Sequence, residues 1–270
     1  MNLTGKANME KQFKDLEGKW ALILGASSGF GAATALRFAQ AGMNICGVHL
    51  DRKATMGQVE TLTSKIKDMK RQALFFNANA ADPEQRATIL QTLKEKNISI
   101  HVLFHSLAFG ALKPFISEDS INQKQVEMTM DVMANSLVYW TQDLVKNGLF
   151  HDGGRIFAMT SAGSQRVWKT YGAVSAAKAT LESHVRQLSL ELAPKKITAN
   201  AICAGVTDTP ALRKIPGNEE MIVMASKRNP YKRLTTPEDI ADAATILSLP
   251  HAHWMTGNVL NIDGGEIISD

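Results

Sequence analysis

This 270-residue chain has few cysteines, no long apolar run and no large excess of either charge. Its two cysteines, Cys46 and Cys203, lie in apolar runs, so neither a disulfide framework nor a cysteine-based zinc site is expected. No run of about eighteen uncharged apolar residues occurs, which argues against a membrane-spanning helix. The 30 basic residues nearly balance the 26 acidic ones, and no dense basic block indicates a nucleic-acid partner.

Residues 1–17 mix lysines with acidic residues and lack the apolar stretch of a secretory signal. The expected location is therefore the cytoplasm. Met9, Phe13 and Leu16 follow helical spacing, which predicts a short amphipathic helix lying on the main domain as an N-terminal extension. An expression or targeting remnant is the alternative interpretation of this segment.

Hydrophobic residues make up 44% of the chain, which is enough to form a large buried core. Short apolar runs alternate with longer segments of helical period, a pattern typical of crossover connections in a parallel sheet. We therefore predict one α/β domain over residues 18–270, a Rossmann-type doubly wound parallel sheet. The segment at about 207–234 has three prolines and no strand pattern, and we interpret it as a helical substrate lid. The expected strands are Trp20–Leu24, Asn44–Leu50, Ala73–Asn77, Val102–His105, Arg155–Thr160, Thr198–Cys203 and Val259–Ile262.

A glycine-rich turn follows the first apolar run, and Ala32–Ala41 after it is predicted to be a helix. Glycines allow a sharp turn and let backbone N–H groups approach a pyrophosphate, while the helix N-terminus adds partial positive charge. A strand, a glycine turn and a helix in this order indicate a dinucleotide site. The residues expected to line it are Gly25, Ser27, Ser28, Gly29, Phe30 and Gly31.

The end of the second expected strand bears on the choice of cofactor. Asp51 lies about twenty residues beyond Gly31, where a carboxylate would hydrogen-bond the ribose 2′-hydroxyl of NAD. Arg52 and Lys53 follow it, and either cation would pair with the 2′-phosphate of NADP. We favour NADPH because of these two cations, while a solvated loop is the plain alternative for them.

Further motifs narrow this nucleotide fold to a family. Asn79-Ala80 follows the third strand, where adenine is usually met, and His105-Ser106-Leu107-Ala108 ends the fourth. Ser161, Tyr171 and Lys178 surround the start of a long helix. Together with the glycine turn, these motifs resemble the short-chain dehydrogenase/reductase family over nearly the whole chain.

The spacing Tyr171-x6-Lys178 departs from most members of that family, which have Tyr-x3-Lys. The position four before the lysine is Val174, which cannot donate a proton. Tyr-x6-Lys is similar to the enoyl-acyl-carrier-protein reductases. Because the chain keeps the glycine spacing Gly-x-x-x-Gly-x-Gly, it most resembles enoyl-ACP reductase III, an NADPH-dependent subclass of bacterial type II fatty-acid synthesis. The resemblance implies reduction of the C2–C3 double bond of a trans-2-enoyl thioester carried by acyl carrier protein.

The resemblance also implies roles for individual residues. Tyr171 and Lys178 would be catalytic, and Ser161 would orient the substrate or the tyrosine. Lys178 would bind the nicotinamide ribose and, through its charge, favour a more acidic tyrosine. The family's active-site asparagine would fall near Met133, and its absence puts the usual alcohol-dehydrogenase proton relay in doubt. Further cofactor contacts are expected at Asn79, Ala80, Ser106, Thr207 and Thr209, with simple turn and capping roles as the alternative for the two threonines.

The tyrosine–lysine spacing has a physical rationale. Seven helical residues advance about 700°, so Tyr171 and Lys178 should lie on nearly one face, roughly 10 Å apart along the axis. When a 2-enoyl thioester is reduced, hydride goes to C3 and charge develops on the thioester oxygen, two atoms further away. A phenol moved back by one turn should reach that oxygen and hydrogen-bond the developing enolate.

Two other classes of function remain as alternatives. A short-chain carbonyl or alcohol dehydrogenase is disfavoured by Val174, and a non-catalytic NADP-binding regulator is disfavoured by the intact Tyr171 and Lys178. The histidines show no metal-ligand spacing with carboxylates, so no metal is predicted.

The predicted protein partners are an acidic acyl carrier protein and further copies of this chain. The carrier would dock near the lid, where basic residues cluster in sequence. Helices at Tyr171–Ala193 and near Val126–Val145 pair subunits in the family, so a homotetramer is expected. The basic cluster is Arg213, Lys214, Lys227, Arg228, Lys232 and Arg233.

Overall fold

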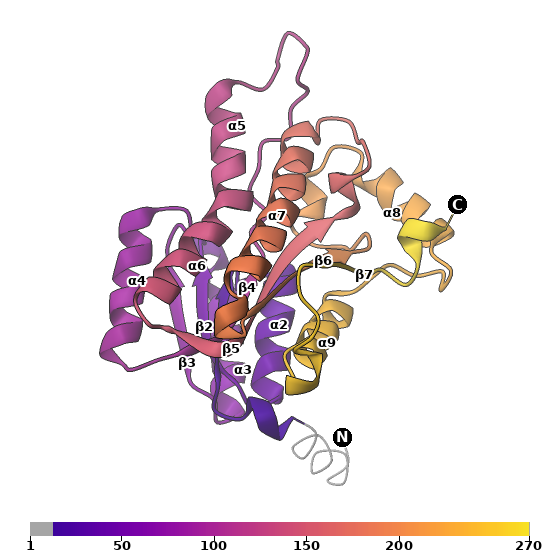
Figure 1. Cartoon of the computed structure of the whole chain (residues 1–270). Helices are drawn as coiled ribbons and strands as arrows, with labels where there is room; N and C mark the ends of the chain where they lie inside the picture. The colour runs from indigo at the N-terminus through magenta and orange to yellow at the C-terminus, as the bar shows by residue number, and fades with distance from the viewer. Residues whose placement is uncertain (1–12, 270) are drawn as a thin grey trace.

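A seven-stranded parallel sheet forms the centre of the molecule. The computed structural model describes residues 13–269, and its strands follow the order β3-β2-β1-β4-β5-β6-β7 (Figure 1). All neighbouring strands pair in parallel, so each connection must cross over the sheet. The predicted doubly wound α/β fold is confirmed. The strands are β1 (Trp20–Leu24), β2 (Asn44–His49), β3 (Ala73–Asn77), β4 (Ile100–His105), β5 (Phe150–Ser161), β6 (Thr198–Ala204) and β7 (Val259–Ile262).

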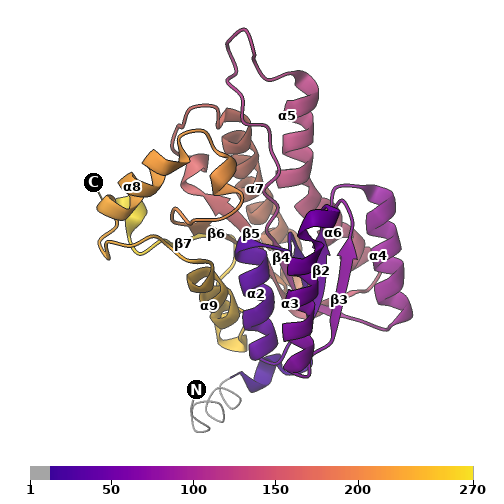
Figure 2. The ribbon, with the colours of Figure 1, turned by 180° about the vertical axis from the view of Figure 1, so that it is seen from behind.

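Helices cover both faces of the sheet. Helices α4, α6 and α7 lie on the face seen in Figure 1, and α2, α3 and α9 lie on the face seen in Figure 2. Along β1, Leu22 and Leu24 enter the apolar cluster under the first set, and Ala21 and Ile23 enter the cluster under the second. A strand buried on both faces needs this continuous apolar sequence. The α-helices are α2 (Gly29–Gln40), α3 (Met56–Asp68), α4 (Pro83–Glu95), α5 (Gln123–Met130), α6 (Ser136–Lys146), α7 (Gly172–Glu191), α8 (Asn218–Arg228) and α9 (Pro237–Leu247).

Capping side chains explain where several of these helices begin. The Asp82 carboxylate accepts the N–H groups of Glu84 and Gln85 at 2.9 and 3.0 Å at the start of α4. Thr236 and Asp239 form a reciprocal capping box at the start of α9. These bonds satisfy N–H groups that have no partner inside the helix.

The helix predicted near Val126–Val145 is not continuous. A π-helical turn, Asp131–Asn135, separates α5 from α6. The wider turn places Met133 and Ala134 in the core and brings Asn135 Oδ1 to 3.2 Å from His184 Nε2 on α7. The prediction of one regular helix was therefore wrong at its middle, because apolar periodicity does not report a π turn.

The start of the described chain packs onto the α2 side of the sheet. A short 3-10 helix, Lys14–Leu16, follows Phe13, and both Phe13 and Leu16 are buried with residues of α2 and α3. Glu17 pairs with Arg71 after α3. The proposed role of Met9 in an amphipathic helix lies outside the described residues.

The fold creates a site at the carboxyl edge of the sheet. β1 pairs with β2 on one side and β4 on the other, so the connections after β1 and β4 leave in opposite directions and open a crevice there. No helix within residues 13–269 is long and apolar enough to cross a membrane. Over the same residues, no cluster of three or more His, Cys, Asp or Glu side chains has the arrangement of a metal site.

Candidate active site

The turn between β1 and α2 is built on close backbone approaches. Gly25 has a φ of +87°, and a Cβ there would lie 2.4 Å from the carbonyl oxygen of Ser106. A Cβ on Gly31 would lie 2.0 Å from the carbonyl oxygen of Gly25. Side chains are excluded at both positions, so the turn can pack directly against α2 and the end of β4. This narrow turn and the free N–H groups at the start of α2 fit the pyrophosphate of a dinucleotide.

The other predicted residues of the turn play different parts. Ser28 is the exposed residue that precedes α2, whereas the Phe30 ring packs partly against the apolar cluster beneath it. The Ser27 side chain hydrogen-bonds Asp51, so it joins the turn to the end of β2. Thr209, far along the chain, lies beside the turn, with Cγ2 3.4 Å from the position of a Cβ on Gly29. The structure therefore brings Thr209 and the glycine turn together.

Asp51 is held at the end of β2 as an ionised carboxylate. Thr55 Oγ1 donates to Oδ1 at 2.7 Å, and His49 Nδ1 lies 2.9 Å from Oδ2. Burial opposes the charge, but hydrogen bonds from Ser27, Thr55 and His49 outweigh it and lower the pKa of Asp51. Its side chain is 14% exposed, so a fixed negative charge borders the dinucleotide crevice.

Arg52 and Lys53, by contrast, are exposed. The sequence offered both a carboxylate and two cations as determinants of cofactor choice. In the structure it is the Asp51 carboxylate that is hydrogen-bonded to the glycine turn.

The loops after β3 and β4 supply backbone to the same crevice. Ser106 N donates to Leu24 O at 2.9 Å, which fixes this loop against β1. Ala80 is buried, and its carbonyl accepts a 2.8 Å hydrogen bond from Trp140 Nε1. The Asn79 side chain caps its own turn by accepting the N–H of Ala81 at 3.0 Å. These contacts set the loop backbones in place, while the predicted cofactor contacts of Asn79, Ala80 and Ser106 stay predictions.

Tyr171 and Ser161 meet between the end of β5 and the start of α7. Tyr171 is the half-buried residue directly before α7, and the Ser161 side chain hydrogen-bonds its phenol. The ring lies against the backbone of Gly163, where a Cβ would come within 2.5 Å of Tyr171 Cε1. Burial raises the pKa of Tyr171, and the hydrogen bond from Ser161 opposes this only in part. The expectation of a more acidic tyrosine was therefore wrong, because desolvation of the phenolate dominates.

Lys178 follows two turns later on α7 and is only 5% exposed. Its Nζ donates to the carbonyl oxygen of Met159 on β5 at 2.6 Å. Burial lowers the pKa of Lys178 to about 8, although Glu182 raises it. The ammonium is thus held at β5, two helical turns from Tyr171, and its predicted contact with the nicotinamide ribose stays a prediction.

An apolar wall occupies the position where most relatives of this fold have their tyrosine. Val174 is buried, and a Cβ on Gly110 would meet Val174 Cγ2 at 2.7 Å and Met133 Sδ at 2.9 Å. Methyl groups and a thioether cannot pass a proton. The structure therefore supports the view that the usual alcohol-dehydrogenase relay is missing near Met133.

His105, at the end of β4, closes the buried side of the site. It is fully buried, with Nε2 2.8 Å from Ser136 Oγ, and Ser136 in turn donates to Val132 O at 2.7 Å. Since the serine proton is used on Val132, Nε2–H must donate to Ser136. Burial and the nearby Lys178 lower the pKa of His105 to about 3, so the ring is neutral.

The proposed lid segment begins after β6, and hydrogen bonds hold its start and its middle in place. Thr207 Oγ1 donates to Gly205 O at 2.9 Å, and Thr209 Oγ1 accepts the N–H of Leu212 at 3.2 Å, so both threonines also fill turn roles. The segment contains a 3-10 helix, Leu212–Lys214, and α8. Trp168 Nε1 donates to Pro216 O at 3.2 Å, which joins the segment to the loop after β5.

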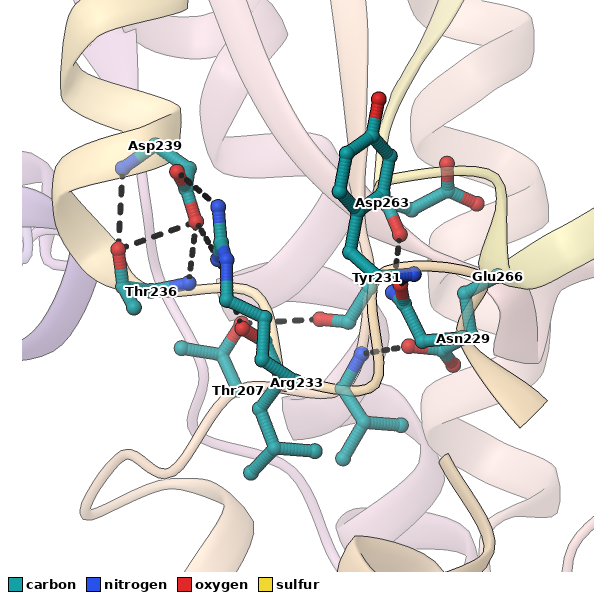
Figure 3. Close-up of polar contacts among 11 residues, drawn as sticks. Thr207, Asn229, Tyr231, Arg233, Thr236, Asp239, Asp263 and Glu266 are labelled. Carbon is teal, nitrogen blue, oxygen red and sulfur yellow. Dashed lines mark hydrogen bonds and ion pairs between the residues drawn. The ribbon is translucent and has the colours of Figure 1, made fainter. Parts of the chain in front are cut away.

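Three polar contacts join the end of this segment to the C-terminal part of the chain, and Figure 3 shows those of Asn229 and Arg233. They are Arg228 with Glu266 at 3.2 Å, Asn229 Nδ2 donating to Asp263 O at 2.8 Å, and Arg233 with Asp239 at 2.6 and 3.0 Å.

These contacts change the interpretation of the basic cluster. Arg213 forms two 2.6 Å hydrogen bonds to Asp208, and Arg228 and Arg233 are paired as described above. Three of the six cations predicted to attract a carrier are therefore already neutralised by acidic neighbours. The exposed lysines of the cluster are Lys214, Lys227 and Lys232.

Comparison with known proteins agrees with this geometry. Residues 25–266 match the model of the family described as Enoyl-(Acyl carrier protein) reductase. The chain belongs to this family.

Individual relatives show how broad the family is. The chain is 29% identical over 256 residues to the enoyl-[acyl-carrier-protein] reductase [NADH] FabI of Nostoc sp., covering 93% of this chain and 97% of that protein. It is 26% identical over 254 residues to the 7alpha-hydroxysteroid dehydrogenase of Escherichia coli K12, covering 93% and 95%. The crystal structure of enoyl-[acyl-carrier-protein] reductase (NADH) from Aquifex aeolicus VF5 superposes with a TM-score of 0.83 at 26% identity, covering 94% and 98%. These matches establish a nicotinamide-dependent oxidoreductase family.

Two residues of this reductase fold were missed by the sequence reasoning. Thr160 Oγ1 donates to Glu182 Oε1 at 2.6 Å, and both residues are buried between β5 and α7. Glu182 follows Lys178 by four residues, one helical turn, and this spacing was the signal available in the sequence. Thr160 gave no signal, because a threonine in a buried strand is ordinary.

Proposed function

We propose that this chain reduces the C2–C3 double bond of a trans-2-enoyl thioester with hydride from a reduced nicotinamide dinucleotide. The observation that supports this best is the position of Tyr171. Its phenol is held by Ser161 two turns from buried Lys178, while the nearer position, Val174, is part of an apolar wall. A hydrogen-bond donor one helical turn further from Lys178 than Val174 suits a reaction in which charge develops on the thioester oxygen, at a distance from the carbon that accepts hydride.

The protein side chains would then orient the Tyr171 phenol and keep it protonated. The bound cofactor supplies the hydride. Because burial raises the pKa of Tyr171, the phenol enters the reaction protonated and can donate a hydrogen bond to the thioester oxygen. Ser161 fixes the direction of that phenol, and the ammonium of Lys178, held by Met159 two turns along α7, adds positive charge to the site.

Exposed apolar side chains on the loops after β4 and β5 support an acyl substrate. Phe109, Phe115 and Ile116 follow β4 and are 58%, 55% and 92% exposed, and Val167 after β5 is 97% exposed. The Phe115 ring lies against Gly172, since a Cβ there would meet Phe115 Cζ at 2.6 Å. Apolar groups on both loops beside the phenol would cover a hydrocarbon chain.

The geometry favours NADH as the cofactor. The ordered Asp51 carboxylate beside Ser27 would accept a hydrogen bond from a free ribose 2′-hydroxyl and would repel a 2′-phosphate. The reductases of Nostoc and Aquifex aeolicus named above are NADH enzymes by description. NADPH, which Arg52 and Lys53 favour in the sequence, is the alternative, and their exposed side chains would have to turn toward the phosphate.

The proposal keeps the other expectations that belong to this role. The substrate would be carried by acyl carrier protein in type II fatty-acid synthesis, in the cytoplasm, and the enzyme would be a homotetramer. Light scattering on the eluting peak of a gel-filtration column would measure the assembly.

The test of the activity compares two thioesters. Oxidation of NADH and of NADPH is followed by absorbance with crotonyl thioester, with acetoacetyl thioester and with neither. We expect crotonyl thioester to be turned over faster than acetoacetyl thioester. Faster turnover of the acetoacetyl compound would instead identify a carbonyl reductase, and cofactor binding without turnover of either would indicate a regulator.

A further inference from the structure

Helix α7 carries a second buried ionisable group beside the proposed catalytic lysine. Glu182 lies one turn after Lys178, and the two residues are 8% and 5% exposed. Consecutive residues of β5 hold both. Thr160 Oγ1 donates to Glu182 Oε1 at 2.6 Å, and Met159 O accepts from Lys178 Nζ at 2.6 Å. The strand therefore fixes the positions of a buried carboxylate and a buried ammonium on one face of the helix.

Burial of these two charges needs a compensating interaction. A buried ammonium tends to lose its proton, because the protein interior solvates charge poorly. A carboxylate one helical turn away attracts the ammonium through the same poorly polarisable interior, where the attraction is stronger than in water. Glu182 is well placed for this, because its hydrogen bond from Thr160 keeps the carboxylate inside the protein instead of letting it turn to solvent.

We propose that Glu182, fixed by Thr160, is a positioning residue that keeps Lys178 protonated and thereby sets the upper pH limit of cofactor binding and turnover. The part that concerns turnover rests on the proposed function. The part that concerns cofactor binding needs only the dinucleotide site of the family.

Among the charges near this pair, Glu182 is the carboxylate that raises the pKa of Lys178, whereas Asp263 and Glu266 act on the pKa of Cys203. His105 is neutral, burial raises the pKa of Cys203 to about 12, and burial raises that of Tyr171, so none of the three is an anion near neutral pH. Burial lowers the pKa of Lys178 to about 8, and Glu182 acts in the opposite direction. The ionisable groups around the pair are Tyr171 directly before α7, His105 on β4, Cys203 on β6, and Asp263 and Glu266 after β7.

The direction of the expected pH effect follows from the proton balance. Lysine is charged below its pKa, so function that needs the ammonium is lost as the pH rises through that value. Removing the carboxylate lowers the pKa of Lys178 further, so the loss must begin at lower pH.

The experiment measures two quantities against pH for the full-length protein. The dissociation constant of NADH is followed by the fluorescence of the bound cofactor, and kcat/KM is followed with crotonyl thioester. In E182Q, the alkaline loss of both should begin about one pH unit lower than in the wild type, the scale of one nearby charge. E191Q removes an exposed carboxylate from the end of the same helix and should leave both profiles unchanged.

Thr160 provides a second route to the same result if E182Q does not fold. T160V removes the hydroxyl that holds Glu182 and should shift the profiles in the same direction by a smaller amount, whereas T160S keeps the hydroxyl and should restore them. An equal loss at every pH in E182Q, or unshifted profiles in E182Q or in soluble T160V, would overturn the proposal. A shifted NADH-binding profile together with no turnover of crotonyl thioester by the wild type would support this inference and reject the proposed function.

Discussion

At the dinucleotide end of the site, backbone packs against backbone, whereas at the proposed catalytic end strand β5 hydrogen-bonds side chains on α7 and directly before it. Gly25 and Gly31 leave no room for a Cβ, and the first side-chain network appears only at Asp51. Around β5 and α7, three consecutive strand residues each bond a different residue of the helix region. The three pairs are Met159 with Lys178, Thr160 with Glu182, and Ser161 with Tyr171.

Under the proposed function, this difference separates the residues that bind the cofactor from the residues that act on the substrate. A turn made of backbone tolerates changes in the side chains around it, and those changes alter which nucleotide binds. A set of buried side chains tolerates much less, since a lost hydroxyl or charge leaves another buried group without its partner. Substitutions at the two ends should therefore have effects of different kind and size.

The largest expected effect comes from Tyr171→Phe. The ring keeps its packing against Gly163, so folding and cofactor binding should survive. Loss of the hydroxyl should lower kcat for crotonyl thioester by about 10²-fold or more, the scale of one lost oxyanion donor. Steady-state kinetics with NADH measures this, and the NADH dissociation constant serves as the control.

Val174→Tyr is the matched variant on the same helix. It restores the spacing of the majority of relatives, but it places a phenol in the wall of Gly110 and Met133 and should not create acetoacetyl reduction. Unchanged crotonyl reduction in Tyr171→Phe would remove Tyr171 from the mechanism.

The dinucleotide end could be predicted from sequence because its signals are local. An apolar strand, a glycine turn and a helix follow one another within a few residues, and each glycine is required by the backbone. The bounds of β1, β3 and β7 were predicted correctly for the same reason. Tyr171, Ser161 and Lys178 were found through the resemblance. In the structure Ser161 hydrogen-bonds Tyr171, and Lys178 follows two turns along α7.

The rest of the catalytic end could not be predicted because it depends on contacts between distant residues. Thr160 and Glu182 are 22 positions apart, and only the packing of α7 on β5 makes them partners. The raised pKa of Tyr171 depends on burial, which the sequence does not state. The π turn at Asp131–Asn135 has an apolar pattern that a regular helix would share.

A smaller effect is expected at Asp51. Asp51→Asn keeps the shape of the side chain and removes its charge, so the electrostatic repulsion that opposes binding of the NADPH 2′-phosphate should decrease. The ratio of kcat/KM for NADPH to that for NADH should rise by about 10-fold, which corresponds to about 1.4 kcal/mol. Kinetics with both cofactors measures the ratio.

The control for this change removes the neighbouring cations. Arg52→Ala combined with Lys53→Ala should alter NADH use little, because both side chains are exposed. A wild-type preference for NADPH that disappears in this double variant would show that the cations, and not Asp51, decide the choice of cofactor.

The smallest expected effect lies outside both ends, at the exposed lysines of the lid segment. Lys214 and Lys227 are exposed, whereas Arg213, Arg228 and Arg233 are engaged by carboxylates, so an acidic carrier should be attracted mainly by the lysines. Reversing both lysines to Glu should raise KM for the carrier-bound substrate several-fold, since charges at the rim of an interface act mainly on the association rate. KM for a short CoA thioester, which does not need the carrier surface, should stay the same.

The matched control reverses Lys67 and Lys94, exposed on α3 and α4, and makes the same change in net charge far from the lid. Parallel increases for both substrates, or an equal increase in the control variant, would show that the lysines act through net charge alone and that the carrier docks elsewhere.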